Sequence, residues 1–146
     1  MILSTIMKKH AERYPDKLAI VCKGKSLTYK EFNEEINRVA NGLLSLGLKR
    51  GDVAGVLSFN NVDYYKAAWA LVKTGIIYAA INALGGPEAN EFQINNTRPK
   101  VLFVEEGFNK VIDSIRPRLK TVEKIICIGS PRDYMESFDE WKSKYP

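Results

Sequence analysis

Residues 51–82 constrain the fold of this chain more than any other stretch. They read as an apolar strand at 53–59, a turn at Asn60-Asn61, an apolar helix at 64–72 closed by Gly75, and a second apolar strand at 76–81. A helix between two strands returns the chain to the edge of the sheet where the first strand began, so the two strands are predicted to be parallel. A parallel sheet carries helices on its faces, and the expected fold class is α/β.

Further strands and helices are predicted on both sides of this unit. In chain order they are a helix at 3–14, an antiparallel hairpin of 18–22 and 26–29, a helix that ends before Gly47, strands at 101–104 and 125–128, a short helix that Pro117 ends, and a closing helix after Ser137. The sequence contains no internal repeat, linker or low-complexity tract. We therefore expect residues 1–146 to form a single three-layer α/β domain, with a mainly parallel sheet of about four strands and an antiparallel hairpin.

The helix after the hairpin has the clearest sequence signature. Thr28 and Glu31 form a T-x-x-E capping box, in which each side chain satisfies a free backbone N–H at the start of the helix. One apolar stripe is predicted to face the core, and the other side is predicted to be polar. The stripe is Phe32, Ile36, Val39, Ala40, Leu43 and Leu44, and the polar side is Glu34, Glu35, Asn37, Arg38 and Asn41. Ser137 and Glu140 predict a second capping box.

The helix at 64–72 is apolar nearly all round. A single small sheet covers a helix on one side only, so a helix of this kind needs cover from elsewhere. The sequence therefore predicts that a further domain, a partner chain or a ligand lies over residues such as Tyr65, Trp69 and Val72.

Composition excludes several classes of protein. A hydrophobic fraction of 45% and a charged fraction of 27% are ordinary, and no run approaches the ~20 apolar residues of a membrane span. The start, MILSTIMKKHAERYP, lacks the cleavage site of a secretory signal, so a cytoplasmic location is expected.

The net charge of +5 comes from scattered Lys and Arg without interleaved aromatics, which argues against a nucleic-acid-binding function. Cys22 and Cys127 lack the paired spacing of a zinc or disulfide framework and are predicted to be reduced core residues.

Three features imitate functional motifs. His10, the only histidine, has no serine, cysteine or carboxylate partner recognisable in the sequence and is predicted to lie on a helix surface. Gly24-Lys25-Ser26 is similar to the end of a phosphate loop but falls in a hairpin turn, and Gly85-Gly86 lacks the lysine and hydroxyl that would complete such a loop. The loops at Asn60-Asn61 and 82–86 remain as strand-end positions where parallel sheets bind ligands.

Several motifs, in their order and spacing, resemble the amino-terminal region of AMP-forming acyl-CoA synthetases, the acyl-adenylate-forming ligases. The opening Arg13-Tyr14-Pro15-Asp16-Lys17-Leu18-Ala19-Ile20 is similar to the family pattern R-x-P-D-K-x-A-I, and Leu27-Thr28-Tyr29, Asn41-Gly42-Leu43 and 46–53 continue it. The strands expected at 100–104 and 124–129 look like later strands of the family. The resemblance covers nearly the whole chain and implies the fold of the family's amino-terminal subdomain.

The chemistry that the resemblance implies depends on motifs that this sequence does not contain. In the family, a fatty carboxylate attacks the α-phosphate of ATP and CoA then displaces AMP, with Mg²⁺ required. The family's Ser/Thr/Gly-rich loop ending Pro-Lys-Gly, its aromatic-Gly-x-Thr-Glu segment, its ribose-binding Asp and its catalytic lysine have no match here. No catalytic or metal-binding residue is therefore assigned, cofactor-binding residues stay unknown, and ATP, CoA and Mg²⁺ are not expected to bind this chain alone. The loop at 82–91 also departs from the family pattern.

Two functions remain open. In the first, the chain is the amino-terminal fragment of an ATP-dependent fatty-acid–CoA ligase of fatty acid metabolism, inactive alone, whose partner is the remainder of the synthetase. In the second, the chain is a stand-alone α/β module that binds a nucleotide or a protein without catalysis. The sequence leaves homo-oligomer formation and acyl chain length undetermined.

Overall fold

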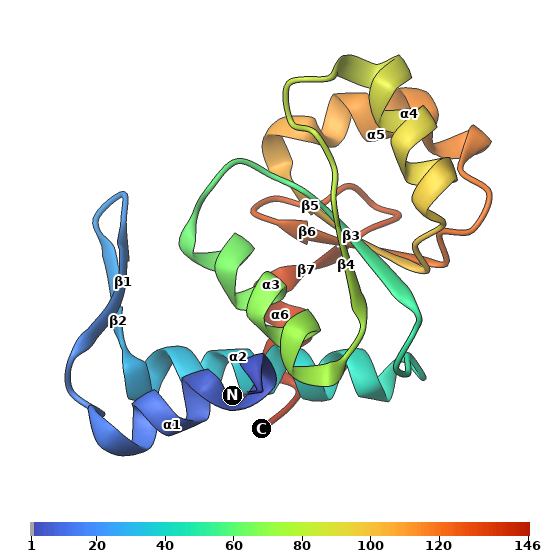
Figure 1. The fold of residues 1–146 in the computed structure, drawn as a ribbon. Helices are drawn as coiled ribbons and strands as arrows, with labels where there is room; N and C mark the ends of the chain where they lie inside the picture. The colour runs from blue at the N-terminus through green and yellow to red at the C-terminus, as the bar shows by residue number, and fades with distance from the viewer. Residues whose placement is uncertain (1) are drawn as a thin grey trace.

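The computed structural model describes residues 2–146, which contain a five-stranded parallel sheet and a separate antiparallel hairpin (Figure 1). The strand order in the sheet is β4-β3-β5-β6-β7. Its strands are β3 (Val53–Leu57), β4 (Ile77–Ala80), β5 (Val101–Glu105), β6 (Lys124–Ile128) and β7 (Glu136–Ser137), and the hairpin pairs β1 (Leu18–Cys22) with β2 (Lys25–Thr28). The predicted α/β class is confirmed. The sheet has five strands rather than about four because the two-residue β7 pairs with β6.

Helices cover both faces of the sheet. They are η1 (Leu3–Thr5), α1 (Ile6–Arg13), α2 (Tyr29–Ser45), α3 (Val62–Thr74), α4 (Gly86–Thr97), η2 (Glu106–Phe108), α5 (Asn109–Ile115), η3 (Arg116–Arg118) and α6 (Phe138–Ser143). The helices α2, α3 and α6 pack on one face, and α4 and α5 pack on the other. Along β5, Val101 and Phe103 belong to the first core and Leu102 and Val104 to the second. This two-sided burial is what a continuous apolar run predicts.

The capping box predicted at Thr28 and the helix end predicted at Gly75 are confirmed, and a side-chain cap lies at the start of α3. At the start of α2, the Thr28 N–H donates to the Glu31 carboxylate at 2.8 Å, and the Glu31 N–H donates to Thr28 Oγ1 at 3.2 Å. At the start of α3, Asn61 Oδ1 accepts from the Tyr64 N–H at 2.8 Å. Gly75 ends α3 with a φ of 73°, a left-handed conformation that glycine adopts without strain.

Only half of the second predicted capping box is formed, at the start of α6. Ser137 Oγ accepts from the Glu140 N–H at 3.5 Å. Within residues 2–146, the Ser137 N–H donates no hydrogen bond to the Glu140 carboxylate. Because β7 immediately precedes this helix, the backbone of Ser137 already belongs to a strand and pairs with Cys127.

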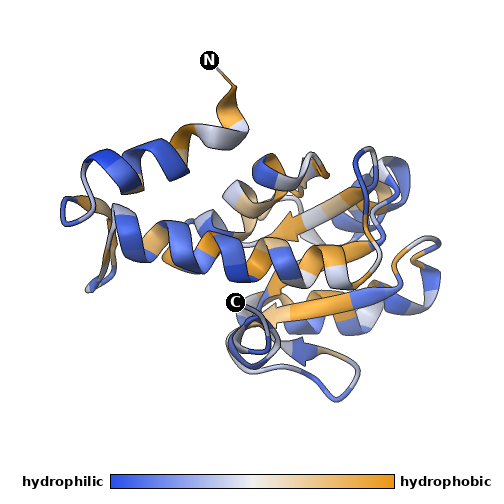
Figure 2. Cartoon of the chain, turned by 90° about the horizontal axis from the view of Figure 1, so that it is seen from below, coloured by the Kyte–Doolittle hydropathy of each residue, from blue (hydrophilic) through white to orange (hydrophobic). Residues whose placement is uncertain are grey.

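The helix α2 is buried over more of its surface than one stripe. In the predicted stripe, Leu44 is 52% exposed, whereas Gly42 outside the stripe is buried. On the side predicted to be polar, Glu35, Asn37, Arg38 and Asn41 are half-buried. Figure 2 shows polar and apolar segments alternating along this helix. The other five residues of the stripe are buried as predicted. The polar side is half-buried because α3, α6 and the carboxyl end of the chain pack against α2, and a periodic pattern cannot anticipate a distant segment.

The chain itself covers α3 on several sides. Besides the sheet, α3 contacts α2, η1 and β1. Its Ala67, Ala70 and Leu71 are fully buried, whereas Tyr65 and Trp69 remain only partly buried. The prediction that cover comes from outside the chain is therefore wrong for most of the helix, and it stays a prediction for the aromatic face.

Gly42 lies where the Trp141 indole crosses α2, and a Cβ at this position would be 2.5 Å from Cζ2 of the ring. Glycine to alanine in a helix interior ordinarily stabilises a protein by about 1 kcal/mol. Because Trp141 is only 1% exposed and cannot move aside, we expect Gly42→Ala instead to lower the free energy of unfolding by about 1–3 kcal/mol in urea denaturation. Gly107→Ala is the control, since a Cβ there meets no atom within 4 Å. A Gly42→Ala variant as stable as the parent would contradict this packing.

Candidate functional site

The carboxyl ends of β3 and β5 meet where the chain reverses its direction across the sheet. The helix α3 leads from β3 outward to β4, and α4 leads back from β4 to β5 on the other side of β3. Open parallel sheets bind ligands in the crevice outside the strand ends at such a point. Both predicted strand-end loops lie at this edge, so it is the first candidate site.

Glu105, the last residue of β5, joins the two strand ends. Its carboxylate accepts from the Phe59 N–H at 2.8 Å and from Ser58 Oγ at 3.0 Å. Asn61 adds a second connection, because its Nδ2 donates to Ser58 Oγ at 3.0 Å and to the Phe59 carbonyl at 3.1 Å. The Phe59 N–H and the Asn61 side chain are thus used within the fold, and Asn61 serves as a helix cap.

A hollow of about 320 Å³ opens between these loops and the turn of the hairpin. Four carboxylates and two amines line it, namely Asp63, Glu105, Glu106, Asp139, Lys23 and Lys25. Besides Glu105, the other three carboxylates also have partners. Glu106 accepts from the Ser130 N–H at 2.8 Å, Asp63 pairs with Lys66 at 2.8 Å, and Asp139 pairs with Lys142 at 3.8 Å. With more carboxylates than amines, this hollow does not fit a triphosphate.

The second strand-end loop, at 82–86, is closed on itself. Asn82 Oδ1 accepts from the Leu84 N–H at 3.0 Å, and the Asn82 carbonyl accepts from the Gly85 N–H at 3.1 Å and from Asn90 Nδ2 at 2.7 Å. The Asn82 N–H in turn donates to Gln93 Oε1 at 2.8 Å. The loop thus has the structure of a turn, in which the amides of Asn82, Leu84 and Gly85 are bonded within the fold.

The other features that imitate functional motifs have structural roles. His10 is half-buried and packs against Tyr29, with ring centroids 5.1 Å apart. Gly24 forms the hairpin turn with a φ of 78°, so Gly24-Lys25-Ser26 is no phosphate loop. Both cysteines are free, as predicted, but only Cys127 is a fully buried core residue, whereas Cys22 is half-buried at the rim of the hollow. Burial raises the pKa of the Cys127 thiol.

Within the described residues, no three His, Cys, Asp or Glu side chains are grouped so that they could hold a metal ion. Among the same residues, no helix combines the length and the apolar character that crossing a membrane requires.

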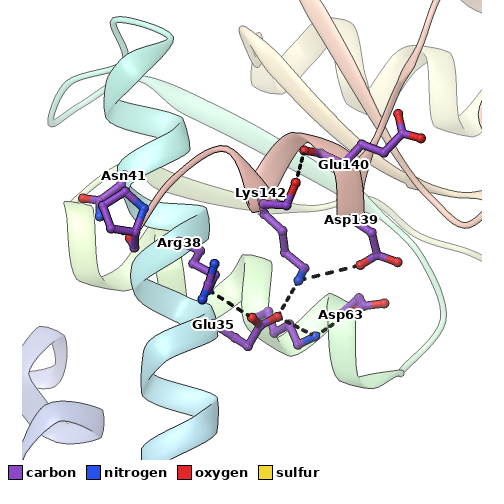
Figure 3. A network of polar contacts seen from close by, with 10 residues as sticks. Glu35, Arg38, Asn41, Asp63, Asp139, Glu140 and Lys142 are labelled. Atoms are coloured by element: carbon purple, nitrogen blue, oxygen red, sulfur yellow. Dashed lines mark hydrogen bonds and ion pairs between the residues drawn. The ribbon is translucent and has the colours of Figure 1, made fainter.

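A network of charged side chains connects α2, α3 and α6 (Figure 3). At its centre, the Glu35 carboxylate lies 3.0 Å from Lys66 Nζ and 2.6 Å from Lys142 Nζ. Arg38 approaches Glu35 at 3.5 Å, and Lys66 also pairs with Asp63 at 2.8 Å. All three helices contribute a charge, so the network fixes how they pack. The central Glu35 carboxylate is bonded to lysines of the other two helices, so its role is structural.

The roles of Glu105 and Glu35 are not predicted from the sequence pattern. The sequence gives a weak indication for Glu105, because a carboxylate at the carboxyl end of a buried parallel strand lies at the edge where such sheets bind ligands. Glu35 carries no signal, since its position on the polar side of an amphipathic helix is also that of an ordinary surface residue.

The fold is also that of solved CoA ligases. The family model described as "AMP-binding enzyme" matches residues 7–145. This chain belongs to that family. A solved structure of the anthranilate CoA ligase AuaEII, in complex with anthranoyl-AMP, superposes with a TM-score of 0.92 at 28% identity, over 100% of this chain and 28% of that one.

Curated relatives are longer than this chain. The fatty acid–[acyl-carrier-protein] ligase ScoC of Streptomyces coeruleorubidus is 29% identical over 93% of this chain and 25% of its own length. A medium/long-chain-fatty-acid–CoA/3-oxocholest-4-en-26-oate–CoA ligase of Mycobacterium marinum is 26% identical over 88% of this chain and 24% of its own length. The chain thus spans about a quarter of these relatives and corresponds to the amino-terminal part of an adenylate-forming ligase.

Removing the charge at the centre of the network is expected to destabilise the fold in a pH-dependent way. Burial by itself raises the pKa of Glu35, but hydrogen bonds from Lys142 and Lys66 outweigh it and hold the pKa below its ordinary value. A lowered folded-state pKa gives stability that is present above the unfolded pKa, about 4.3, and is lost as pH falls through the folded value. We expect Glu35→Gln to lower the free energy of unfolding by about 1–3 kcal/mol at neutral pH, with the difference from the parent shrinking below about pH 4.

Glu34→Gln is the matched control, because the neighbouring Glu34 is exposed and loses the same charge. The measurement is urea denaturation at a series of pH values. Equal stability of Glu35→Gln and Glu34→Gln would show that the network does not hold the helices together.

Proposed function

We propose that this chain is the amino-terminal lobe of an ATP-dependent, AMP-forming fatty-acid–CoA ligase and performs no catalysis by itself. The complete enzyme would convert a carboxylate, ATP and CoA to an acyl-CoA through an acyl-adenylate. The observation that carries the proposal is the family match over residues 7–145, in relatives about four times as long. The choice of CoA as acceptor is part of the proposal, because the relatives include ligases for CoA and for an acyl-carrier protein.

The chemistry of adenylation supports the absence of activity in this lobe. The first step brings a carboxylate and a triphosphate together, so it requires phosphate-binding donors, Mg²⁺ and a cation at the developing charge. At the strand-end hollow, carboxylates outnumber amines, and the Phe59 N–H and the Asn61 amide are already bonded within the fold. The residues of this edge do not fit ATP, and no reaction step is assigned to them.

An incompletely covered aromatic face supports a role as one lobe of a larger scaffold. Tyr65 and Trp69 on α3 border an apolar hollow of about 240 Å³, together with Tyr29 and Phe32 of α2 and Ile20 of the hairpin. The hairpin extends beside this face as a separate sheet, with Val21 65% exposed. Two-stranded sheets are marginally stable alone. Further polypeptide of the ligase is the partner that we propose for this face.

Two finer points belong to the same proposal. A cytoplasmic location accords with the ordinary composition and with an intracellular pool of fatty acids, ATP and CoA.

The alternative, a stand-alone α/β module, depends on the strand-end hollow. Because carboxylates outnumber amines in that hollow, the structure gives this alternative less support.

The purified chain is expected to give no acyl-dependent exchange between ATP and pyrophosphate above a protein-free blank, across fatty acids of short to long chain. The reason is that the phosphate loop and the catalytic lysine of the family are missing from its sequence. A complete ligase of the family, assayed alongside, serves as the positive control. Exchange that follows the chain through a second purification step would refute the proposal, and tight ATP binding without exchange, measured by calorimetry, would favour the stand-alone module.

A further inference from the structure

A hollow of about 540 Å³ lies between α1, α2 and the carboxyl end of α3. Lys8 and Glu12 of α1, Lys30 and Asn33 of α2, and Lys73 of α3 line it. The strand-end site adjoins the first turn of α3, whereas Lys73 is in its last turn, so the two sites are separated by roughly 18 Å along the helix axis. The hollow is therefore distinct from the candidate site described above and does not depend on the proposed function.

Lys73 is a half-buried cation without an anionic partner. Its ammonium group donates a hydrogen bond to Asn37 Oδ1, a neutral acceptor. Within residues 2–146, no carboxylate forms an ion pair with it. Burial lowers the pKa of Lys73, and the positive charge of Lys8 lowers it further. Two amines that repel each other in this way would both be stabilised by an anion between them.

The other two lysines occupy helix positions that disfavour a cation. Lys8 is in the first turn of α1 and Lys30 in the first turn of α2, at the positive ends of the helix dipoles. The first turn of α1 contains no acidic residue, and Glu31 in the first turn of α2 is engaged in the capping box. Glu12 is the one carboxylate in the wall of the hollow, and it lies 3.9 Å from Lys8 with both side chains about two-thirds exposed. Three ammonium groups thus face one weakly paired carboxylate.

We propose that this hollow binds a phosphate group. The three lysines and the one carboxylate leave an excess of two positive charges, which matches the charge of a phosphate group near its second ionisation. Ammonium groups also form charge-assisted hydrogen bonds to phosphate oxygens. Asn33 of α2 lines the same hollow. The phosphate belongs either to a free ion or small phosphorylated molecule, or to the headgroup of a lipid, and both sources use the same three amines.

The test is a titration of the chain with inorganic phosphate and with pyrophosphate, followed by the backbone and Asn side-chain amide signals in NMR. Potassium chloride at equal ionic strength corrects for screening. We expect saturable shifts at residues of α1, of the first half of α2 and of the last turn of α3. Lys73→Gln and Lys8→Gln are each expected to weaken binding about tenfold, the effect of losing one charge-assisted hydrogen bond.

Lys110→Gln is the matched control, because this exposed lysine on α5 has the same charge and lies outside the hollow. Lys8 is exposed, so its variant is expected to fold even if the half-buried Lys73 proves structurally important. Circular dichroism of each variant verifies the fold before titration.

A second arm separates the two sources. Sedimentation with vesicles of phosphatidylcholine, with and without phosphatidylglycerol, measures binding to a lipid headgroup. If the free ions bind saturably and Lys73→Gln or Lys8→Gln weakens this binding, the ligand is a free phosphate. If the chain binds the vesicles and the same variants weaken that binding, the ligand is a lipid headgroup. Both outcomes support the site. Absence of both, or equal weakening by Lys110→Gln, would overturn it.

Discussion

Burial of β5 on both of its faces is the constraint on which the rest of the structure depends. Alternate residues of this strand enter two separate cores, and Val101 to Val104 are at most 2% exposed. A strand buried in this way needs a helical layer on each side and parallel neighbours on each edge. The neighbouring β3 accommodates it with Gly55, where a Cβ would be 2.6 Å from Leu102. The order of the sheet, the reversal at β3 and the meeting of strand ends follow from this arrangement.

Local sequence signals predict the elements well because each acts over a few residues. The capping box at Thr28, the cap at Asn61 and the left-handed Gly75 each place a helix end within one or two residues. The sequence pattern cannot reveal the two-residue β7, because a strand of that length is defined by its partner β6 rather than by its own residues. The partial burial of the polar side of α2 escapes prediction for a similar reason, since α6 lies about a hundred residues further along the chain.

The candidate sites were less predictable than the fold. The strand-end loops were placed at the correct edge, because the direction of parallel strands determines where their ends meet. Their polar atoms, however, bond to one another through Glu105 and Asn82, and such pairings depend on side-chain geometry that residue type alone does not give. The three lysines around the hollow at α3 come from three helices, so only the packed structure brings them together.

The packing of Trp141 against Gly42 has a spectroscopic consequence. The chain contains two tryptophans, of which Trp141 is enclosed in the core and Trp69 borders the partly covered aromatic face. An indole in apolar surroundings emits at shorter wavelength than one in contact with water, so the two fluorophores report on different regions. The emission wavelength of Trp141 therefore reports on unfolding of the core. The emission wavelength of Trp69 reports on binding of further polypeptide or another partner over α3.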